Sequence, residues 1–152
     1  MLKVGDKVKD FKLKDFEGNS HSLSEHSGKK IVVYFYPKDN TPGCTTQACD
    51  FRDNFHEIKN KNVVLFGISP DNASSHEKFS NQYNLPFTLL SDETTETARY
   101  FGAFGKRNVY GRMIEGIIRS TYIIDEAGLI EKIWHPAIAS KNVKEVIEYL
   151  NN

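Results

Sequence analysis

Two unbroken runs of β-branched and aromatic residues dominate the hydrophobic pattern of the chain. They cover residues 31–36 and 63–68, and a proline follows each run within two positions. Runs without polar alternation predict strands that are buried on both faces of a sheet. Between them, apolar residues recur at helical spacing and predict a helix from about residue 44 to residue 60. These residues are Phe51, Phe55 and Ile58.

The rest of the chain contains further helix and strand patterns. Capping residues open a predicted helix over 71–83, and a shorter helix is expected over 94–101. Two β-rich runs, 120–125 and 129–134, are separated by a short glycine-containing turn, which predicts an antiparallel hairpin. An apolar stripe predicts a final helix over 141–150. This order predicts an α/β protein with a mixed central sheet flanked by helices, as in a thioredoxin-like fold.

The length and charge of the chain limit the number of domains it can form and the classes of partner it can bind. With 152 residues, no internal repeat and no low-complexity segment, we expect one domain over residues 1–152. Lys plus Arg and Asp plus Glu are each 20, so the net charge of zero gives no electrostatic case for nucleic acid or a membrane surface. The N-terminal residues are charged and lack the apolar stretch of a secretory signal, which favours a reducing, cytoplasmic location.

The two cysteines, Cys44 and Cys49, are the candidates for chemistry. They are too few for a disulfide framework, so they are metal-binding, redox-active or incidental. Cys44 falls where a buried strand ends and a helix begins, and a helix N-terminus favours a thiolate. The spacing of the pair is not a strong zinc pattern and the five histidines are scattered, so we expect no metal and no cofactor. The glycines of 102–105 and 111–116 form no phosphate loop and are interpreted as loop glycines.

The segment around Cys44 resembles a known family. Pro37, Thr41 and Cys44 have the spacing Pro-x-x-x-Thr-x-x-Cys within the stretch YFYPKDNTPGCT, which is similar to the signature of the peroxiredoxins. A second cysteine five residues on resembles the bacterioferritin-comigratory protein, or peroxiredoxin Q, subfamily. The likeness continues through residues 85–92, 110–112 and 116–125 and into the predicted C-terminal helix.

The resemblance implies a thiol-dependent peroxidase that reduces hydrogen peroxide and organic hydroperoxides. By this likeness Cys44 is the peroxidatic cysteine, Thr41 donates its hydroxyl to the peroxide, Pro37 shields the thiolate and Arg119 positions and polarises the substrate. Cys49 is the resolving cysteine, and a thioredoxin-like dithiol is the reductant. We expect a monomer, although dimers occur in the wider family.

The five-residue gap between the cysteines has a geometric consequence. On a regular helix, residues five apart have Cα atoms roughly 8 to 9 Å apart, whereas a disulfide needs less than about 7 Å. If Cys49 resolves the sulfenic acid of Cys44, the helix must unwind in each cycle. The alternative is that Cys49 is an inert helix residue that faces inward, and that an outside thiol resolves Cys44.

Other functions are compatible with parts of the pattern. A thiol-disulfide oxidoreductase shares the fold, but this chain lacks Cys-x-x-Cys and has Arg119 where such enzymes place a proline. A hydrolase would need Cys44 and His135 to meet, and no pattern in the sequence indicates that they do. A peroxide sensor, relay or holdase would use the same oxidation of Cys44 without sustained turnover.

Overall fold

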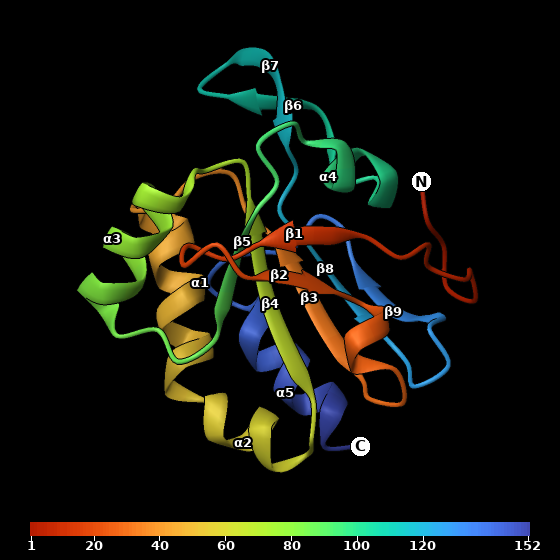
Figure 1. Cartoon of the computed structure of the whole chain (residues 1–152). Helices are drawn as coiled ribbons and strands as arrows, with labels where there is room; N and C mark the ends of the chain where they lie inside the picture. Colours follow the sequence, from red (N-terminus) through yellow and green to blue (C-terminus); the bar gives the residue numbers. More distant parts are fainter.

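A seven-stranded mixed sheet, in the order β2-β1-β5-β4-β3-β8-β9, forms the centre of the protein (Figure 1). The computed structural model describes all residues, 1–152. The three inner strands β3, β4 and β5 are parallel, and β8 and β9 continue the sheet in antiparallel pairing. The predicted mixed sheet and the predicted hairpin are therefore confirmed. The strands of this sheet are β1 (Lys12–Lys14), β2 (Ser20–Ser22), β3 (Ile31–Phe35), β4 (Val64–Ser69), β5 (Thr88–Ser91), β8 (Ser120–Ile124) and β9 (Ile130–Trp134).

Helices connect the strands and cover the sheet. The helix predicted over 44–60 is two helices, because the chain turns at Asn54, whose side-chain amide donates to the Asp50 carbonyl over 2.9 Å. The other predicted helices are present with slightly different ends. The helices are the 3-10 helix η1 (Ser24–His26), α1 (Pro42–Asp53), α2 (Phe55–Asn60), α3 (Ala73–Tyr83), α4 (Glu96–Phe101) and α5 (Asn142–Leu150).

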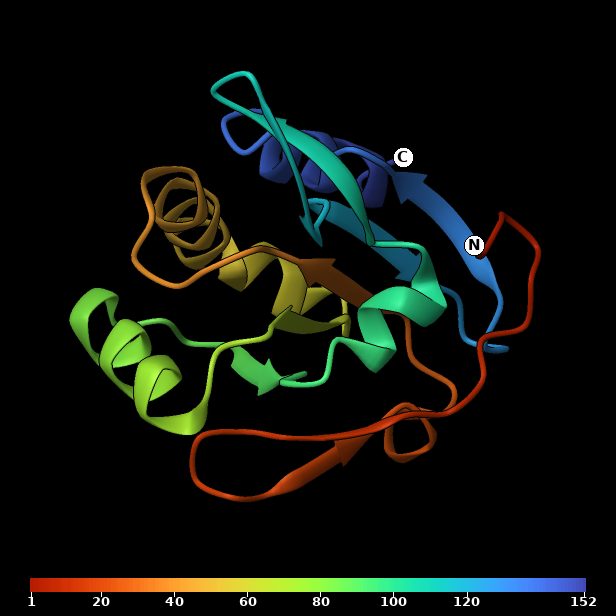
Figure 2. The ribbon, with the colours of Figure 1, turned by 90° about the horizontal axis from the view of Figure 1, so that it is seen from above.

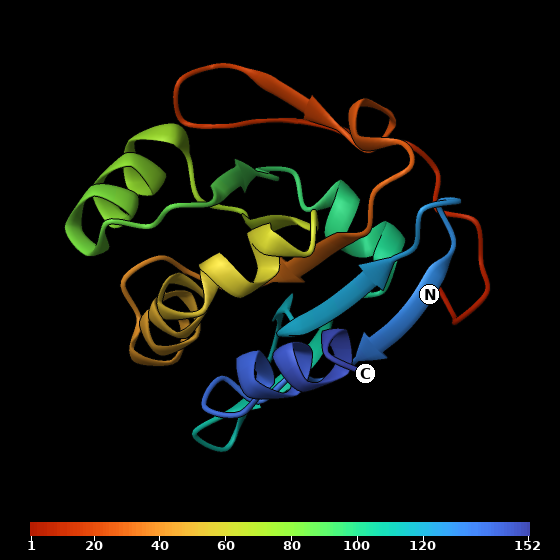
Figure 3. The same cartoon turned by 90° about the horizontal axis from the view of Figure 1, so that it is seen from below.

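Two apolar layers bury the two faces of β3. Alternate residues, such as Tyr34 and Phe35, belong to different layers, which explains the unbroken hydrophobic run of this strand. One layer includes Phe51 of α1 and Val146 of α5, and the other includes Phe101 of α4. The turned views show α1 and α5 on one side of the sheet, with α4 and the N-terminal segment on the other (Figures 2 and 3).

A second, two-stranded sheet projects from the end of the molecule above α4 (Figure 1). It consists of β6 (Phe104–Val109) and β7 (Arg112–Ile117). The interpretation of its glycines as loop residues was wrong for Gly105 and Gly116, which face each other across this hairpin. Tyr110 and Gly111 form the turn with positive φ angles of 51° and 82°. The strands were not predicted because half of their residues are exposed and only Ile117 is buried, so no buried face imposes a hydrophobic alternation.

None of the helices combines the length and the apolar character that crossing a membrane requires.

Candidate active site

Cys44 lies in the first turn of α1, as the sequence predicts. Thr41 has an extended backbone with φ −85° and ψ 155°, and the helix begins at Pro42. Proline suits this position because the N–H that it lacks would have no partner within the helix. Cys44 is only 1% exposed and packs in the layer between α1 and the sheet. Its sulfur is therefore buried beside the positive end of a helix.

Arg119 brings a cation to this sulfur from a distant part of the chain. Its Nη2 donates to Cys44 Sγ over 3.4 Å, and the residue stands in the short connection between β7 and β8. A Cβ atom on Gly43 would lie 3.1 Å from Arg119 Nη2, so glycine leaves room for this approach. The guanidinium and the sulfur can thus form a charge-assisted contact.

A chain of buried amides and hydroxyls orients the guanidinium. Arg119 Nη1 donates to Gln47 Oε1 over 2.7 Å, and Gln47 Nε2 donates to Asn142 Oδ1 over 3.0 Å. Thr121 Oγ1 donates to the same Asn142 oxygen over 2.7 Å. Gln47, Asn142 and Thr121 are fully buried. Sequence analysis did not identify them; the only available signal was Gln47, three residues after Cys44 and so on the same face of the helix.

Thr41 and Pro37 lie in the loop between β3 and α1. The Thr41 hydroxyl donates to the Lys38 carbonyl over 2.8 Å. Its proton is therefore engaged within the loop, and its free lone pairs can accept a hydrogen bond from a peroxide O–H. The expectation that Thr41 donates to the peroxide requires this hydroxyl to turn away from the Lys38 carbonyl, and it stays a prediction. Pro37 is partly buried two residues after the end of β3, and its shielding role stays a prediction.

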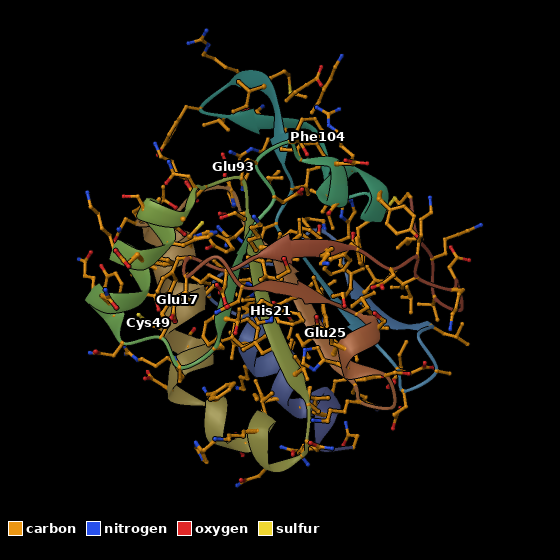
Figure 4. The ribbon with its side chains drawn as sticks, viewed as in Figure 1. Glu17, His21, Glu25, Cys49, Glu93 and Phe104 are labelled. Atoms are coloured by element: carbon orange, nitrogen blue, oxygen red, sulfur yellow. The ribbon has the colours of Figure 1, made fainter.

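Cys49 lies farther along α1, at the position labelled in Figure 4, and both cysteines are free thiols. It is partly exposed, unlike Cys44. Burial raises the pKa of the Cys49 thiol, and Arg52 opposes this effect while Asp53 adds to it. Because both thiols lie on one continuous helix, the helical separation argued from the sequence applies, and a disulfide requires α1 to open.

The histidines that are scattered along the sequence are partly gathered by the fold. His21 and His26 lie with Glu25, which is labelled beside His21 in Figure 4, so that ligand atoms of the three are within 4.8 Å of one another. His76 lies equally close to two aspartates. Neither group contains a cysteine, so neither completes a zinc site with Cys44 or Cys49.

His135 does not pair with Cys44. Its Nδ1 lies 2.7 Å from Ser120 Oγ, and burial lowers the pKa of its imidazole. The side chain that contacts the sulfur is Arg119, a cation that cannot act as a general base. The geometry therefore gives no support to a Cys–His hydrolase.

A buried cysteine in the first turn of a helix, faced by an arginine, defines a thiol-based redox site rather than a hydrolytic one. The model of the AhpC/TSA family matches residues 4–133. The chain is 48% identical over 149 residues to a putative peroxiredoxin bcp of Helicobacter pylori, an alignment that covers 98% of each protein. It is 40% identical over 151 residues to peroxiredoxin Bcp of Bacillus subtilis, covering 99% of this chain and 96% of the relative.

A solved structure of the bacterioferritin comigratory protein of Xanthomonas campestris has the same fold. It superposes with a TM-score of 0.87 at 32% identity, covering 93% of this chain and 90% of that chain. The chain belongs to the AhpC/TSA family, among relatives named peroxiredoxin Bcp. It is a thiol-dependent peroxidase, and the predicted thioredoxin-like fold is confirmed.

Proposed function

We propose that Cys44 is the peroxidatic cysteine of this enzyme and that its thiolate attacks the terminal oxygen of a hydroperoxide. A sulfur–oxygen bond forms while the O–O bond breaks, so the sulfur is oxidised by two electrons and the peroxide is reduced. The departing oxygen takes up a proton and leaves as water or an alcohol. Cys44 becomes a sulfenic acid. The observation that carries this proposal is the 3.4 Å contact between Arg119 Nη2 and Cys44 Sγ.

Two sets of donors stabilise the charge that moves during this step, and Thr41 orients the substrate. Negative charge passes from the sulfur to the departing oxygen, and donors fixed toward that oxygen lower the barrier most. Arg119 supplies such donors, and the first-turn N–H groups of α1, which lack partners within the helix, supply others. Thr41 accepts the peroxide O–H and so orients the substrate, while its own proton stays on the Lys38 carbonyl.

The second half of the cycle uses Cys49. Unwinding of α1 brings the Cys49 sulfur to the sulfenic acid, a disulfide forms and water leaves. A thioredoxin-like dithiol then reduces the disulfide and restores both thiols. The whole chain, residues 1–152, acts as one peroxiredoxin domain and works as a monomer, because the resolving thiol is in the same chain. A reducing compartment such as the cytoplasm supplies the dithiol.

The substrates in this proposal are hydrogen peroxide and organic hydroperoxides. The Xanthomonas campestris relative has an alkyl peroxide reduction activity, which supports the second class. A steady-state assay with a thioredoxin system tests the proposal. The enzyme should consume many equivalents of hydrogen peroxide and of an alkyl hydroperoxide per protein. Oxidation by a single equivalent, followed by a persistent mixed disulfide with another protein, would instead support the sensor or relay function.

Cys49→Ser is expected to separate the two halves of the cycle. The variant should still form the Cys44 sulfenic acid with one equivalent of peroxide, because Cys49 does not touch the reacting sulfur. Turnover with thioredoxin should fall about tenfold or more, since no internal thiol resolves the intermediate. Mass spectrometry of the oxidised wild type should show a Cys44–Cys49 disulfide, with some loss of helical circular dichroism. Unchanged turnover of Cys49→Ser would contradict the internal cycle.

The rate of disulfide formation is expected to depend on pH through Cys49. Because burial raises the pKa of this thiol in the folded helix, little thiolate is present at neutral pH. Once α1 unwinds, the thiol should have an ordinary pKa of about 8.5. The rate should therefore rise about tenfold per pH unit and level off near that value. Rapid mixing with acid trapping measures the rate, and a plateau well above pH 8.5 would show attack from the folded helix.

A further inference from the structure

A buried polar cluster lies behind the loop that carries Thr41, and the chemistry described above does not use it. Its centre is the pair of Asp39 and His76, whose side chains are 2% and 0% exposed. His76 comes from α3 and Asp39 from the loop after β3. The cluster touches neither Cys44 nor Arg119 through any hydrogen bond, so its influence on the site must pass through the loop.

His76 is hydrogen-bonded through both ring nitrogens. Its Nδ1 lies 2.8 Å from Asp39 Oδ2, and its Nε2 lies 3.1 Å from the Leu90 carbonyl oxygen. A carbonyl oxygen only accepts, so Nε2 carries a proton. The Asp39 side chain also accepts from Tyr36 Oη over 2.6 Å and from Ser75 Oγ over 2.8 Å. Asp39 and His76 thus form a buried pair whose polar atoms are held by three further groups.

These contacts fix the loop from three sides. Tyr36 directly follows β3, Ser75 and His76 come from α3, and the Asp39 N–H donates to Asp71 Oδ2 over 2.8 Å. Asp71 is in turn held by the Ser69 hydroxyl over 2.7 Å. The backbone of Asp39 is thus attached to β4 while its side chain is attached to α3.

The fixed loop determines where the Thr41 hydroxyl points. That hydroxyl donates to the carbonyl of Lys38, the residue directly before Asp39. Asn40, between Asp39 and Thr41, has a left-handed backbone with φ 63°, a conformation that asparagine tolerates better than most residues. A shift of Asp39 therefore moves the acceptor of Thr41 and the start of α1 together.

We propose that the hydrogen-bonded pair of Asp39 and His76 positions Thr41 for the peroxide. The pair is a positioning device of the proposed peroxidase reaction, on which this inference rests, and it makes no contact with the reacting atoms. Asp39 precedes α1 and His76 belongs to α3, so the pair lies outside the helix that must unwind. Loss of the pair should therefore slow the reaction with peroxide without slowing reactions of Cys44 that do not need Thr41.

A double-mutant cycle between His76→Gln and Thr41→Val tests the proposal. All proteins carry Cys49→Ser, so Cys44 is the only thiol. The rate constant for sulfenic acid formation with hydrogen peroxide should fall about 10- to 100-fold in His76→Gln, as expected for a misplaced catalytic group. In the Thr41→Val background the same substitution should change the rate by about twofold or less, because the group that His76 positions is already absent. If the two residues acted independently, the loss caused by His76→Gln would be the same in both backgrounds.

Two further measurements separate positioning from loss of structure. Alkylation of Cys44 by iodoacetamide, a reagent with no peroxide O–H for Thr41 to accept, should stay within about twofold of the parent. Tyr122→Phe removes a buried hydroxyl that donates to the Phe101 carbonyl over 3.1 Å, and it should leave the peroxide rate unchanged.

Ser75→Ala removes one hydrogen bond to Asp39 and should slow the peroxide reaction to a smaller extent than His76→Gln. This variant keeps the test valid if His76→Gln does not fold.

The positioning role would be overturned if the rate losses of His76→Gln and Thr41→Val multiplied in the double variant. It would also be overturned if His76→Gln slowed alkylation of Cys44 as much as it slowed the reaction with peroxide. A parent protein that forms no Cys44 sulfenic acid would overturn the proposed function itself and this inference with it. The two failures are therefore distinguishable in one set of measurements.

Discussion

Cys44→Ser is expected to abolish peroxide consumption, leaving only the background rate of the buffer. A serine oxygen cannot accept the peroxide oxygen to form an analogue of the sulfenic acid, and at neutral pH it is not ionised. The loss should be complete with both hydrogen peroxide and an alkyl hydroperoxide, because one sulfur performs the oxidative step for every substrate. Steady-state turnover with a thioredoxin system measures the effect.

Controls for this variant follow from the position of Cys44. The side chain is buried, but it faces the polar groups of Arg119, so serine should change the free energy of unfolding by about 1 kcal/mol or less. Thermal unfolding followed by circular dichroism tests that point. Cys49→Ser is the matched variant, since it removes the other thiol of the same helix and should keep a single oxidation. Residual turnover of a folded Cys44→Ser protein would contradict the assignment.

Arg119→Met should lower the rate constant for sulfenic acid formation by about 100- to 1,000-fold, the usual cost of removing one donor from a developing anion. Methionine approximates the length and apolar stem of arginine but has neither its charge nor its N–H groups. The substitution also leaves Gln47 Oε1 without the donor that lies 2.7 Å away. Quenched-flow trapping of the sulfenic acid measures the rate constant.

Arg119→Lys is the informative comparison. Lysine keeps the positive charge but cannot donate to Gln47 and Cys44 from two nitrogens of one rigid plane. We expect an intermediate loss of about tenfold, between the wild type and the methionine variant. Equal rates for the lysine variant and the wild type would show that charge alone is required. A wild-type rate in Arg119→Met would contradict the role of the arginine altogether.

Local pattern was sufficient for most of the framework. The run before Pro37 is fully buried on both faces as β3, and the glycine-containing turn at 126–128 does join two antiparallel strands. Both predictions rest on short-range physics, namely hydrophobic burial and turn geometry. The placement of Cys44 in the first turn of a helix rests on the same kind of argument, because strand end, proline and helix start are adjacent in the chain.

Local sequence pattern did not predict the elements whose burial leaves no distinct hydrophobic periodicity. The hairpin of β6 and β7 is largely exposed, and its glycines were therefore taken for loop residues. The break at Asn54 was missed because apolar residues continue at helical spacing across it. The hydrogen bond from Thr41 to the Lys38 carbonyl was not predicted either, because no local pattern shows how this loop folds.

By itself, the sequence determined the α/β framework, the reactive cysteine at a helix start and, by resemblance, the family. Only the tertiary structure decided how the guanidinium of Arg119 is held, because Gln47 and Asn142 are 95 residues apart and meet only when α1 and α5 pack on the same face of the sheet. It also decided that Asp39 and His76, 37 residues apart, form one buried hydrogen-bonded pair. Long-range polar contacts of this kind leave no periodicity in a sequence. Each buried polar residue needs a hydrogen-bond partner, but nothing in its own stretch of sequence indicates which distant residue that partner is.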